Sequence, residues 1–407
     1  MDTTDISPTS SQRRIAVVTS CRADWGLLHG VVRELQRLSG AEPLIVATNM
    51  HLNPAFGHTV DEIEADGFPV AARVEMNTPG GDTSPLATAS AAARCLDGMA
   101  RAFADLRPDI VLILGDRYEM LPVATAATIL RIPLAHIAGG EISEGAFDDN
   151  IRHALTKLSS LHFTATDDYR RRVIQMGEHP SRVFYCGALG VQNLMDLPDK
   201  ASVAELEQFT GVKIDRDTLL VTFHPATLDT EATPADRCRA LLDAIDRFPS
   251  STVVFTYPNN DPGGEDIISL ITAYANARPG RCAVIPSLGR RRYLSMLRHI
   301  GAVAGNSSSG IVEVPSAGIP TVDIGIRQKG RTASRSVIHC GDSADEIAEA
   351  IARALSPEGR VVAASAPNPY SLPGTAARIA QVLSEVPLDS LSPKRFFDLQ
   401  VETLKDL

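Results

Sequence analysis

Residues 132–164 read IPLAHIAGGEISEGAFDDNIRHALTKLSSLHFT. The first six are apolar enough for a short buried strand, the residues from Ile151 recur at helical spacing, and LHFT is a second strand. This order predicts a parallel α/β sheet, in which ligands bind at the carboxyl edge of the strands. The loop and the start of the helix hold four carboxylates, an arginine and a histidine. The segment is either a solvated loop with a helix cap at Asp148 or Asp149, or part of a functional site.

The same alternation of strands and helices fills the rest of the chain. Residues 14–20 form the first expected strand, and a second cycle starts at residues 219–227. We therefore predict two successive doubly wound, Rossmann-like α/β domains. The predicted parts are a disordered tail at 1–13, an N-terminal domain at 14–190, a C-terminal domain at 191–385, and a helical segment at 386–407 able to pack back on the first domain.

Composition excludes several classes of function. The 407 residues are 44% hydrophobic and 22% charged, as in an ordinary globular protein of two or three domains. The formal net charge of -10 argues against a general affinity for nucleic acid or anionic membranes, so an anionic ligand needs a local cluster of donors. The six cysteines lack metal-ligand spacing, and no apolar run approaches the roughly 18 residues of a membrane span. We expect a cytoplasmic enzyme with reduced thiols, no metal and no cofactor.

Residues 305–318, GNSSSGIVEVPSAG, follow an apolar strand and place glycines and serines where a helix starts. Backbone N–H groups and hydroxyls at such a start bind anions, and a diphosphate is the natural ligand. A plain serine N-cap is the alternative, but it explains one serine and not three. Glu313, one to two turns further on, is placed to accept hydrogen bonds from a ribose. The run matches neither the dinucleotide-binding nor the Walker pattern, so we infer neither NAD binding nor ATP hydrolysis.

Other polar residues also follow predicted strands. Arg22 lies after the first strand, where its guanidinium either clamps a phosphate or forms a surface ion pair. His224 ends the first strand of the second domain, as a phosphate contact or as a structural histidine. Asp116 and Arg117 form either a simple ion pair or part of a site on the same sheet edge as Glu141. Carboxylates that converge on one pocket acquire different pKa values, which supplies an acid and a base for moving protons on a sugar ring.

Taken together, these segments resemble the hydrolysing UDP-N-acetylglucosamine 2-epimerases of sialic and legionaminic acid synthesis, including those that act on UDP-N,N'-diacetylbacillosamine. The resemblance covers roughly residues 14–385. It is carried by SCRADWGLL, MHLNPAFG, GDRYEM, HIAGGEISEGAFDDNIRHALTKLSSLHF, TFHPATL, YPNND, and GNSSSGIVEVPSAGIP with GIRQKGR downstream. It implies two facing Rossmann-like domains of the GT-B type known from nucleotide-sugar glycosyltransferases, an active site in the cleft between them, and a homodimer or homotetramer.

The resemblance also implies roles for the residues that match the family's motifs. Asp116, Glu141 and Asp148 correspond to the acid/base carboxylates, and Arg117 and His51 lie on the sugar side. The residues that fall where the family holds UDP are Arg22, His224, Asn259, Ser307, Ser308, Glu313 and Arg327. The implied reaction is an anti elimination of UDP to a glycal, followed by hydration. It converts UDP-GlcNAc to ManNAc and UDP, or acts in the same way on a UDP-2,4-diacetamido sugar.

Two other functions keep the same nucleotide site, namely a GT-B glycosyltransferase and a non-hydrolysing UDP-GlcNAc 2-epimerase. Neither accounts for the segment EGAFDDNIRH. A non-catalytic UDP-sugar binder requires broken carboxylates, and all three are present. The chain departs from the family at two positions, with Asn49 where the family often has Gly and Ser336 where it commonly has Asn. The identity of the acid and the base, and the substituent at C4 of the sugar, stay open at this point.

Overall fold

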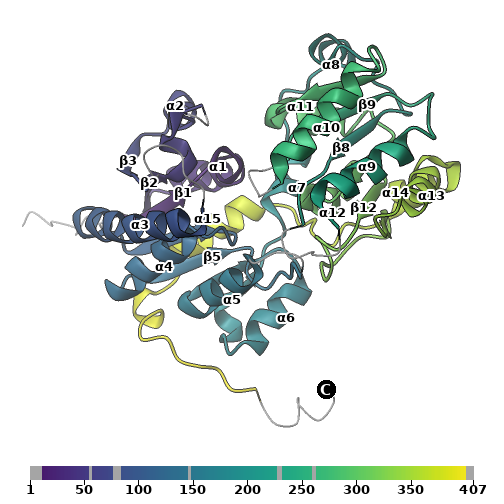
Figure 1. Ribbon diagram of the computed structural model, residues 1–407. Coiled ribbons are helices and arrows are strands. Elements are labelled where there is room, and N and C mark those ends of the chain that lie inside the picture. The colour runs from purple at the N-terminus through teal and green to yellow at the C-terminus, as the bar shows by residue number, and fades with distance from the viewer. Residues whose placement is uncertain are drawn as a thin grey trace, which may run out of the picture. The chain divides into compact units, whose positions relative to one another are not determined.

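The structure is a computed structural model that describes residues 12–54, 57–76, 84–144, 148–226, 232–258 and 263–399. It contains two compact units (Figure 1). The first comprises Met1–Gly140, Asn150–Leu189 and Gly374–Leu407, and the second comprises Glu141–Asp149 and Gly190–Pro373. Each unit has a parallel sheet of its own, so the predicted fold class, two Rossmann-like α/β domains, is confirmed.

The first unit is built on a seven-stranded parallel sheet with the order β3-β2-β1-β4-β5-β6-β7. Side chains alternate along β1, so that Ile15 and Val17 enter one apolar core while Ala16 and Val18 enter another. Both faces of the sheet are therefore buried, as in most parallel sheets. The strands are β1 (Arg13–Thr19), β2 (Ala41–Thr48), β3 (Val70–Val74), β4 (Ile110–Leu114), β5 (Leu134–Ile137), β6 (Leu161–Thr164) and β7 (Val183–Tyr185).

Helices cover the two faces of this first sheet. Most show one apolar stripe, but α4 is apolar on nearly all sides, which hides its helical period in the sequence. The helices are α1 (Arg22–Arg37), α2 (Val60–Ala65), α3 (Pro85–Leu106), α4 (Met120–Ile129), α5 (Asp148–Leu158), α6 (Asp167–Gln175) and α15 (Thr375–Glu385), with short 3-10 turns η1 (Asn49–Leu52), η3 (Pro180–Arg182) and η5 (Leu388–Ser390).

The second unit contains a six-stranded parallel sheet with the order β10-β9-β8-β11-β12-β13. Its strands are β8 (Leu219–Thr222), β9 (Val253–Thr256), β10 (Cys282–Ile285), β11 (Ala302–Gly305), β12 (Thr321–Ile324) and β13 (Val337–Cys340). Its helices are α7 (Leu189–Met195), α8 (Val203–Thr210), α9 (Pro234–Ile245), α10 (Gly264–Asn276), α11 (Gly289–Met296), α12 (Ser308–Val312), α13 (Ala344–Leu355) and α14 (Pro357–Ser365), with the 3-10 turn η4 (Val314–Ala317) after α12.

Both sheets reverse their strand order at one place, between β1 and β4 in the first unit and between β8 and β11 in the second. At such a switch point the connecting segments leave toward opposite faces, which opens a crevice at the carboxyl ends of the two strands. The residues that follow these four strands are therefore the first place to look for a site. They include Ser20, Gly115, Phe223 and Asn306.

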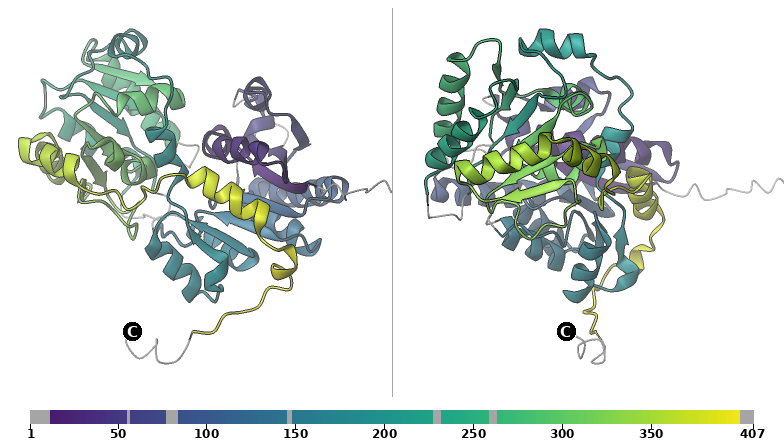
Figure 2. Two further views of the ribbon diagram at one scale, coloured as in Figure 1. Left: turned by 180° about the vertical axis from the view of Figure 1, so that it is seen from behind. Right: turned by 90° about the vertical axis from the view of Figure 1, so that its right-hand side faces the viewer.

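The chain returns to the first unit at its end, and this corrects a predicted boundary. The sequence predicts residues 374–385 in the C-terminal domain, whereas α15 packs on α1 in the first unit (Figure 2). Ile379 and Leu383 enter the first core, and Arg13 Nη1 donates to the carbonyl oxygen of Leu383 at 2.8 Å. The described part of the predicted 386–407 helix contains only the turn η5, and its remainder lies outside the described residues.

Three smaller differences concern element boundaries. The helix α1 begins at Arg22, with Cys21 as its N-cap, so almost no loop follows the first strand. The strand β7 ends at Tyr185, and α7 follows from Leu189. The strand β13 was not predicted, because VIHC has little apolar pattern.

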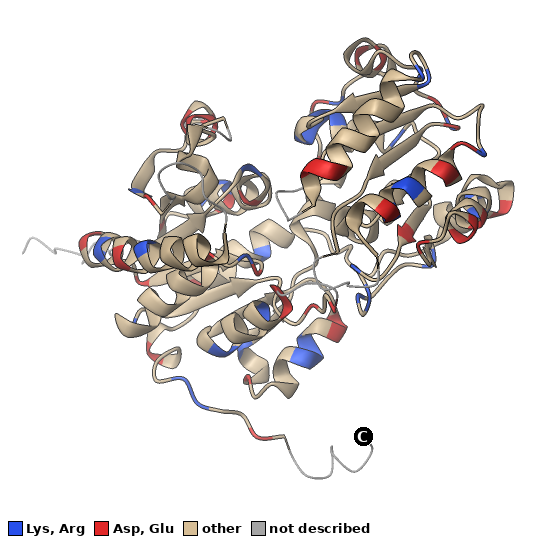
Figure 3. Cartoon of the chain, viewed as in Figure 1, with Lys and Arg blue, Asp and Glu red and all other residues tan. Residues whose placement is uncertain are grey.

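Acidic and basic residues are interspersed along the described helices. Figure 3 shows both signs of charge on α3 and on α9. An anionic ligand therefore depends on local donors, as the net charge of -10 already indicates. Within the described ranges, no helix combines the length and the apolar character needed to cross a membrane.

Candidate functional site

The carboxylate of Asp116 lies directly after β4, at the switch point of the first sheet. Gly115 turns the chain with a φ of 76°, and its carbonyl oxygen is 2.7 Å from His136 Nε2 on β5. Asp116 forms an ion pair with Arg152 of α5, whose side chain is only 2% exposed. Arg152 stands one helical turn after Asp148, the first residue of α5, so both project from the same face of that helix. A buried guanidinium therefore fixes Asp116 while leaving its carboxylate 25% exposed.

Arg117 is held by a buried acid that the sequence did not single out. Arg117 Nε donates to Glu119 Oε1 at 2.7 Å, and Asn49 Nδ2 donates to the same oxygen at 2.9 Å. Burial alone would raise the pKa of Glu119, but the charge of Arg117 and these two hydrogen bonds outweigh it and lower the pKa. Asn49 has a φ of 51°, a left-handed conformation that glycine adopts freely and that asparagine tolerates. Asn49 therefore adopts the backbone conformation that a glycine would have here, and it adds a side-chain amide.

His51 and Arg22 already have partners within the first unit. His51 is buried in η1, with Nε2 at 2.9 Å from Thr19 Oγ1 and Nδ1 at 2.8 Å from Thr59 Oγ1. Burial lowers the pKa of His51 to about 4, so the ring is neutral near pH 7. Arg22 is 57% exposed and pairs with Glu62 of α2. The structure therefore shows Arg22 in a surface ion pair, the alternative that the sequence leaves open.

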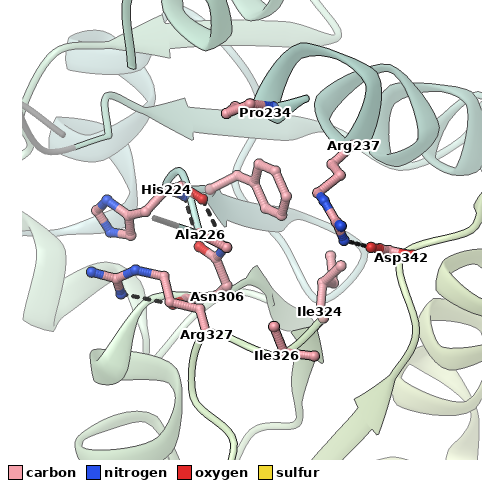
Figure 4. A pocket seen from close by; sticks show the side chains of 11 residues that line it. His224, Ala226, Pro234, Arg237, Asn306, Ile324, Ile326, Arg327 and Asp342 are labelled. Carbon is pink, nitrogen blue, oxygen red and sulfur yellow. Dashed lines mark hydrogen bonds and ion pairs between the residues drawn. The ribbon is translucent and has the colours of Figure 1, made fainter. Parts of the chain in front are cut away.

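In the second unit, the side chain and the backbone carbonyl of Asn306 together connect three loops (Figure 4). The backbone N–H of His224 donates to Asn306 Oδ1 at 2.7 Å, and Asn306 Nδ2 donates to the carbonyl oxygen of His224 at 2.8 Å. The backbone carbonyl of Asn306 accepts from Arg327 Nη1 at 3.1 Å and from Gln328 Nε2 at 2.8 Å. The loops after β8, β11 and β12 are thereby held at fixed spacing. Two of the predicted anion-binding residues, His224 and Arg327, lie on these loops.

Ser307 and Ser308 start α12 directly after Asn306. Ser307 occupies the N-cap position, but its side chain makes no capping hydrogen bond. The plain N-cap alternative therefore does not describe this serine. The helix is short, from Ser308 to Val312, so hydroxyls and the neighbouring cationic side chains contribute more to an anion site than a helix dipole does. Ser336, the second departure, is buried next to β12, and its carbonyl oxygen accepts from the Thr321 N–H at 3.0 Å.

A pocket opens at the same edge, beside His224 and Arg327 (Figure 4). Its walls are partly apolar, with Phe223 and Ile324 among them, and Asn306 lies beneath. On another side, Arg237 of α9 pairs with Asp342. The pocket thus combines apolar surface with donors at the carboxyl ends of β8, β11 and β12, which is the usual composition of a small-molecule site.

Glu313 presents a buried carboxyl group near this edge. Tyr293 Oη lies 2.5 Å from Ser309 Oγ, and Ser309 in turn hydrogen-bonds the Glu313 carboxyl group. Glu313 Oε2 is buried and has no hydrogen-bond partner among the described residues. Burial raises the pKa of Glu313 to about 7, against the lowering effects of Ser309 and of the charge on Arg331. A Cβ on Gly190 would lie 2.0 Å from Glu313 Oε1, so only glycine at 190 gives this carboxyl group room.

Glu141 belongs to the second unit, although it follows a strand of the first sheet. Arg331 Nη1 lies 2.5 Å from Glu141 Oε2, and Arg331 Nη2 donates to Ser143 Oγ at 3.2 Å. The Ser143 N–H donates to Asp149 Oδ1 at 2.7 Å. Asp149 therefore ties the acidic loop to the first turn of α5, while Glu141 is held by a cation.

The structure groups the predicted residues in part. It brings His224, Arg327, Ser307 and Ser308 to one sheet edge, and it places Asp116 and Arg117 side by side after β4. Asn259 lies outside the described residues. Sequence reasoning missed Arg152, Arg331 and Asn306, although the spacing of one turn between Asp148 and Arg152 was a usable signal. Within the described ranges, no three His, Cys, Asp or Glu side chains are grouped as a metal site would require.

Comparison with known proteins adds to this geometry. Residues 33–384 match the family model described as UDP-N-acetylglucosamine 2-epimerase. The chain is similar to the "GDP/UDP-N,N'-diacetylbacillosamine 2-epimerase (hydrolyzing)" of Campylobacter jejuni, with 37% identity over 81% of this chain and 84% of that protein. It is also similar to the "UDP-N,N'-diacetylbacillosamine 2-epimerase (hydrolyzing)" of Legionella pneumophila, with 33% identity over 93% and 97% of the two chains.

Solved structures agree on the fold. The UDP-GlcNAc 2-epimerase of Neisseria meningitidis, solved bound to UDP-GlcNAc, has a TM-score of 0.76 and 17% identity over 91% of this chain and 99% of its own. That likeness supports the GT-B-like fold class, with two Rossmann-like domains, inferred from the sequence. The family model spans most of the chain, and two relatives above 30% identity span more than four-fifths of it. The chain therefore belongs to the UDP-N-acetylglucosamine 2-epimerase family.

Proposed function

We propose that the protein is a hydrolysing 2-epimerase of a UDP-linked 2-acetamido sugar, which releases UDP and the free 2-epimer. One observation carries the proposal: two relatives that match nearly the whole chain are both named as hydrolysing 2-epimerases of N,N'-diacetylbacillosamine nucleotides. The intact set of carboxylates, Asp116, Glu141 and Asp148, agrees with it. The same two names favour a substrate with acetamido groups at both C2 and C4.

The second unit supplies suitable partners for UDP. His224, Arg327 and the hydroxyls of Ser307 and Ser308 surround one sheet edge and can hold a diphosphate by charge-assisted hydrogen bonds. Glu313 has a carboxyl oxygen without a hydrogen-bond partner among the described residues, which suits a ribose diol. We also assign Arg22 and Asn259 to this nucleotide. Binding of UDP then requires the guanidinium of Arg22 to exchange Glu62 for phosphate.

The sugar reaction moves protons at C2 while the bond to UDP breaks at C1. A C2 proton is poorly acidic, so its removal depends on cleavage of the C1–O bond, which gives C1 oxocarbenium character. One carboxylate of the set Asp116, Glu141 and Asp148 takes this proton as UDP departs with the bonding electron pair, leaving a glycal. Water then adds its hydroxyl at C1, and a second acidic group delivers a proton to C2 from the opposite face. We place His51 and Arg117 on the sugar side of this reaction.

The test is to incubate the pure protein in D2O with UDP-GlcNAc, and separately with a UDP-2,4-diacetamido-trideoxyhexose, without any acceptor. Proton and phosphorus NMR should show UDP, a free 2-epimerised sugar and deuterium at C2. Release of UDP only after an acceptor is added would instead indicate a glycosyltransferase. A 2-epimer that stays linked to UDP would indicate a non-hydrolysing epimerase, and either result would refute the proposal.

A further inference from the structure

The acidic loop that follows β5 is fastened to the second unit and not to the sheet it leaves. Residues Glu141–Asp149 group with Gly190–Pro373, whereas both flanking segments belong to the first unit. The loop lies against the segment that follows β12. The Glu144 N–H donates to the carbonyl oxygen of Lys329 at 3.4 Å, and Lys329 Nζ lies 3.3 Å from Glu144 Oε2.

Close backbone packing supports this attachment. Gly330 has a φ of 87°, and a Cβ at this position would lie 2.7 Å from Ile142 Cγ2. Any other residue at 330 would therefore both strain the backbone and push against the loop. The chain between Lys329 and Arg331 is thus shaped to receive residues 141–144.

The strongest contact between the two segments is the pair of Arg331 and Glu141. Both side chains are 10% exposed, and their atoms Nη1 and Oε2 are 2.5 Å apart. The second terminal nitrogen of the same guanidinium reaches Ser143 Oγ at 3.2 Å. One arginine therefore holds two points of the loop through two separate nitrogens of its planar guanidinium, whereas a lysine would have to reach both from a single nitrogen.

Other charged groups lie near this contact. Glu313 is close enough for its carboxyl group to be affected by both Arg331 and Glu141. Lys329 and Glu144 form their own pair at the exposed side of the loop. Removal of Arg331 would take the guanidinium away from the buried Glu141 carboxylate, and the loss of one member of a buried ion pair is strongly destabilising for the contact.

We propose that Arg331 is a positioning residue that latches residues 141–144 to the second unit and sets the location of the Glu141 carboxylate. This inference rests on the proposed function in one respect, the acid/base role of Glu141. The attachment of residues 141–144 by Arg331 follows from the described contacts alone, so it can be tested both by hydrogen exchange and by enzyme kinetics. The arginine that follows on the same segment, Arg335, is exposed and serves as the matched control.

The first measurement is hydrogen exchange of the full chain, in the peptide that contains residues 141–144. Arg331→Ala should speed exchange of the Glu144 amide at least about tenfold, because the loop then opens locally. Arg331→Lys should give a smaller increase, and Arg335→Ala should give none. Unchanged exchange in Arg331→Ala would overturn the latch whatever the activity of the enzyme.

The second measurement separates positioning from overall stability. Arg331→Ala should lower kcat about 100-fold, the loss expected for an acid/base group displaced by about 1 Å, while the Kd for UDP changes less than about threefold. Millimolar guanidinium ion should restore part of kcat in Arg331→Ala but not in Glu141→Gln. In the Glu141→Gln background, Arg331→Ala should have no further effect on kcat. An equal loss in both backgrounds would overturn the proposal. A wild-type protein that turns over no UDP-sugar would refute the proposed function instead, and the exchange result would remain as measured.

Discussion

The proposed contact between Glu313 and the ribose of UDP predicts that UDP binding depends on pH. Burial raises its pKa to about 7, and Glu313 Oε2 has no hydrogen-bond partner among the described residues. Burial also raises the pKa of its neighbour Tyr293, so this phenol stays neutral near pH 7. A ribose diol donates two hydrogen bonds, so it is bound best by the ionised carboxylate. Binding of the ribose should therefore release a proton from Glu313 and become tighter as pH rises.

The size of the effect follows from the ionised fraction. With a pKa of about 7, the carboxylate is ionised in about 9% of molecules at pH 6 and in about 91% at pH 8. Apparent affinity scales with the fraction in the competent state, so the contribution of the diol to binding should rise about tenfold over this range. At pH 7, about half a proton should be released for each UDP bound.

The assay must separate the ribose from the phosphates, which also titrate. Calorimetric Kd values for UDP and for 2',3'-dideoxy-UDP at pH 6, 7 and 8 give a ratio in which the phosphate contribution cancels. This ratio should rise about tenfold in the wild type and stay constant in Glu313→Gln. A flat ratio in the wild type would refute the reasoning, and so would the same slope in the amide variant, because the proton would then come from another group.

Three further predictions concern catalysis and stability. Asp116→Asn should lower kcat by about 100-fold or more, while the Kd for UDP stays within a few-fold of the wild-type value. Steady-state kinetics and calorimetry measure the two quantities. Equal losses in both would show that the residue has a structural role. Gly305→Ala should lower the free energy of unfolding by at least about 2 kcal/mol in urea titrations, because the residue has a φ of 135° and its Cβ would lie 2.0 Å from a carbonyl oxygen of β8; a stable variant would contradict this. Lys394→Met should destabilise the protein by about 2 kcal/mol at pH 7, since it removes a partner of buried Glu178. Burial opposes ionisation of Glu178, but its hydrogen bonds lower its pKa from 4.5 to about 2. This stabilisation is therefore present above about pH 4.5 and is lost as pH falls toward 2. Thermal unfolding measured across that pH window should show a smaller loss of stability with acid in the variant than in the wild type.

Most of the fold could be predicted from the sequence, because many of its strands are continuous apolar runs, some of which lead into a glycine. IVLIL before Gly115 and AVA before Gly305 are examples. The helix α4 could not be predicted in this way, since a helix that is apolar on all sides has no period to detect. The place of α15 was also out of reach. Its apolar stripe indicates that one face is buried, but a stripe does not specify which sheet it covers.

The candidate site could also be predicted only in part. Residues at strand ends, such as His224 and Asp116, follow from the rule that ligands bind at the carboxyl edge of a parallel sheet. The partners that fix them do not, because Arg152 and Arg331 reach their carboxylates only through tertiary contacts. Arg22 shows a third case, since its strand-end position left a phosphate contact and a surface ion pair open, and the structure shows the ion pair with Glu62.

The return of α15 to the first unit has a consequence for synthesis on the ribosome. The first unit needs Ile379 and Leu383 to complete its core, and these residues are made only after the whole of Gly190–Pro373. About 180 residues separate the two parts, which takes roughly 10–40 s at ordinary rates of translation. During that interval the apolar face that α1 offers to α15 is open to water or to chaperones, because α15 has not yet been made. The first unit should therefore complete its core only after the chain of the second unit has been made, against the order in which the two units begin in the sequence.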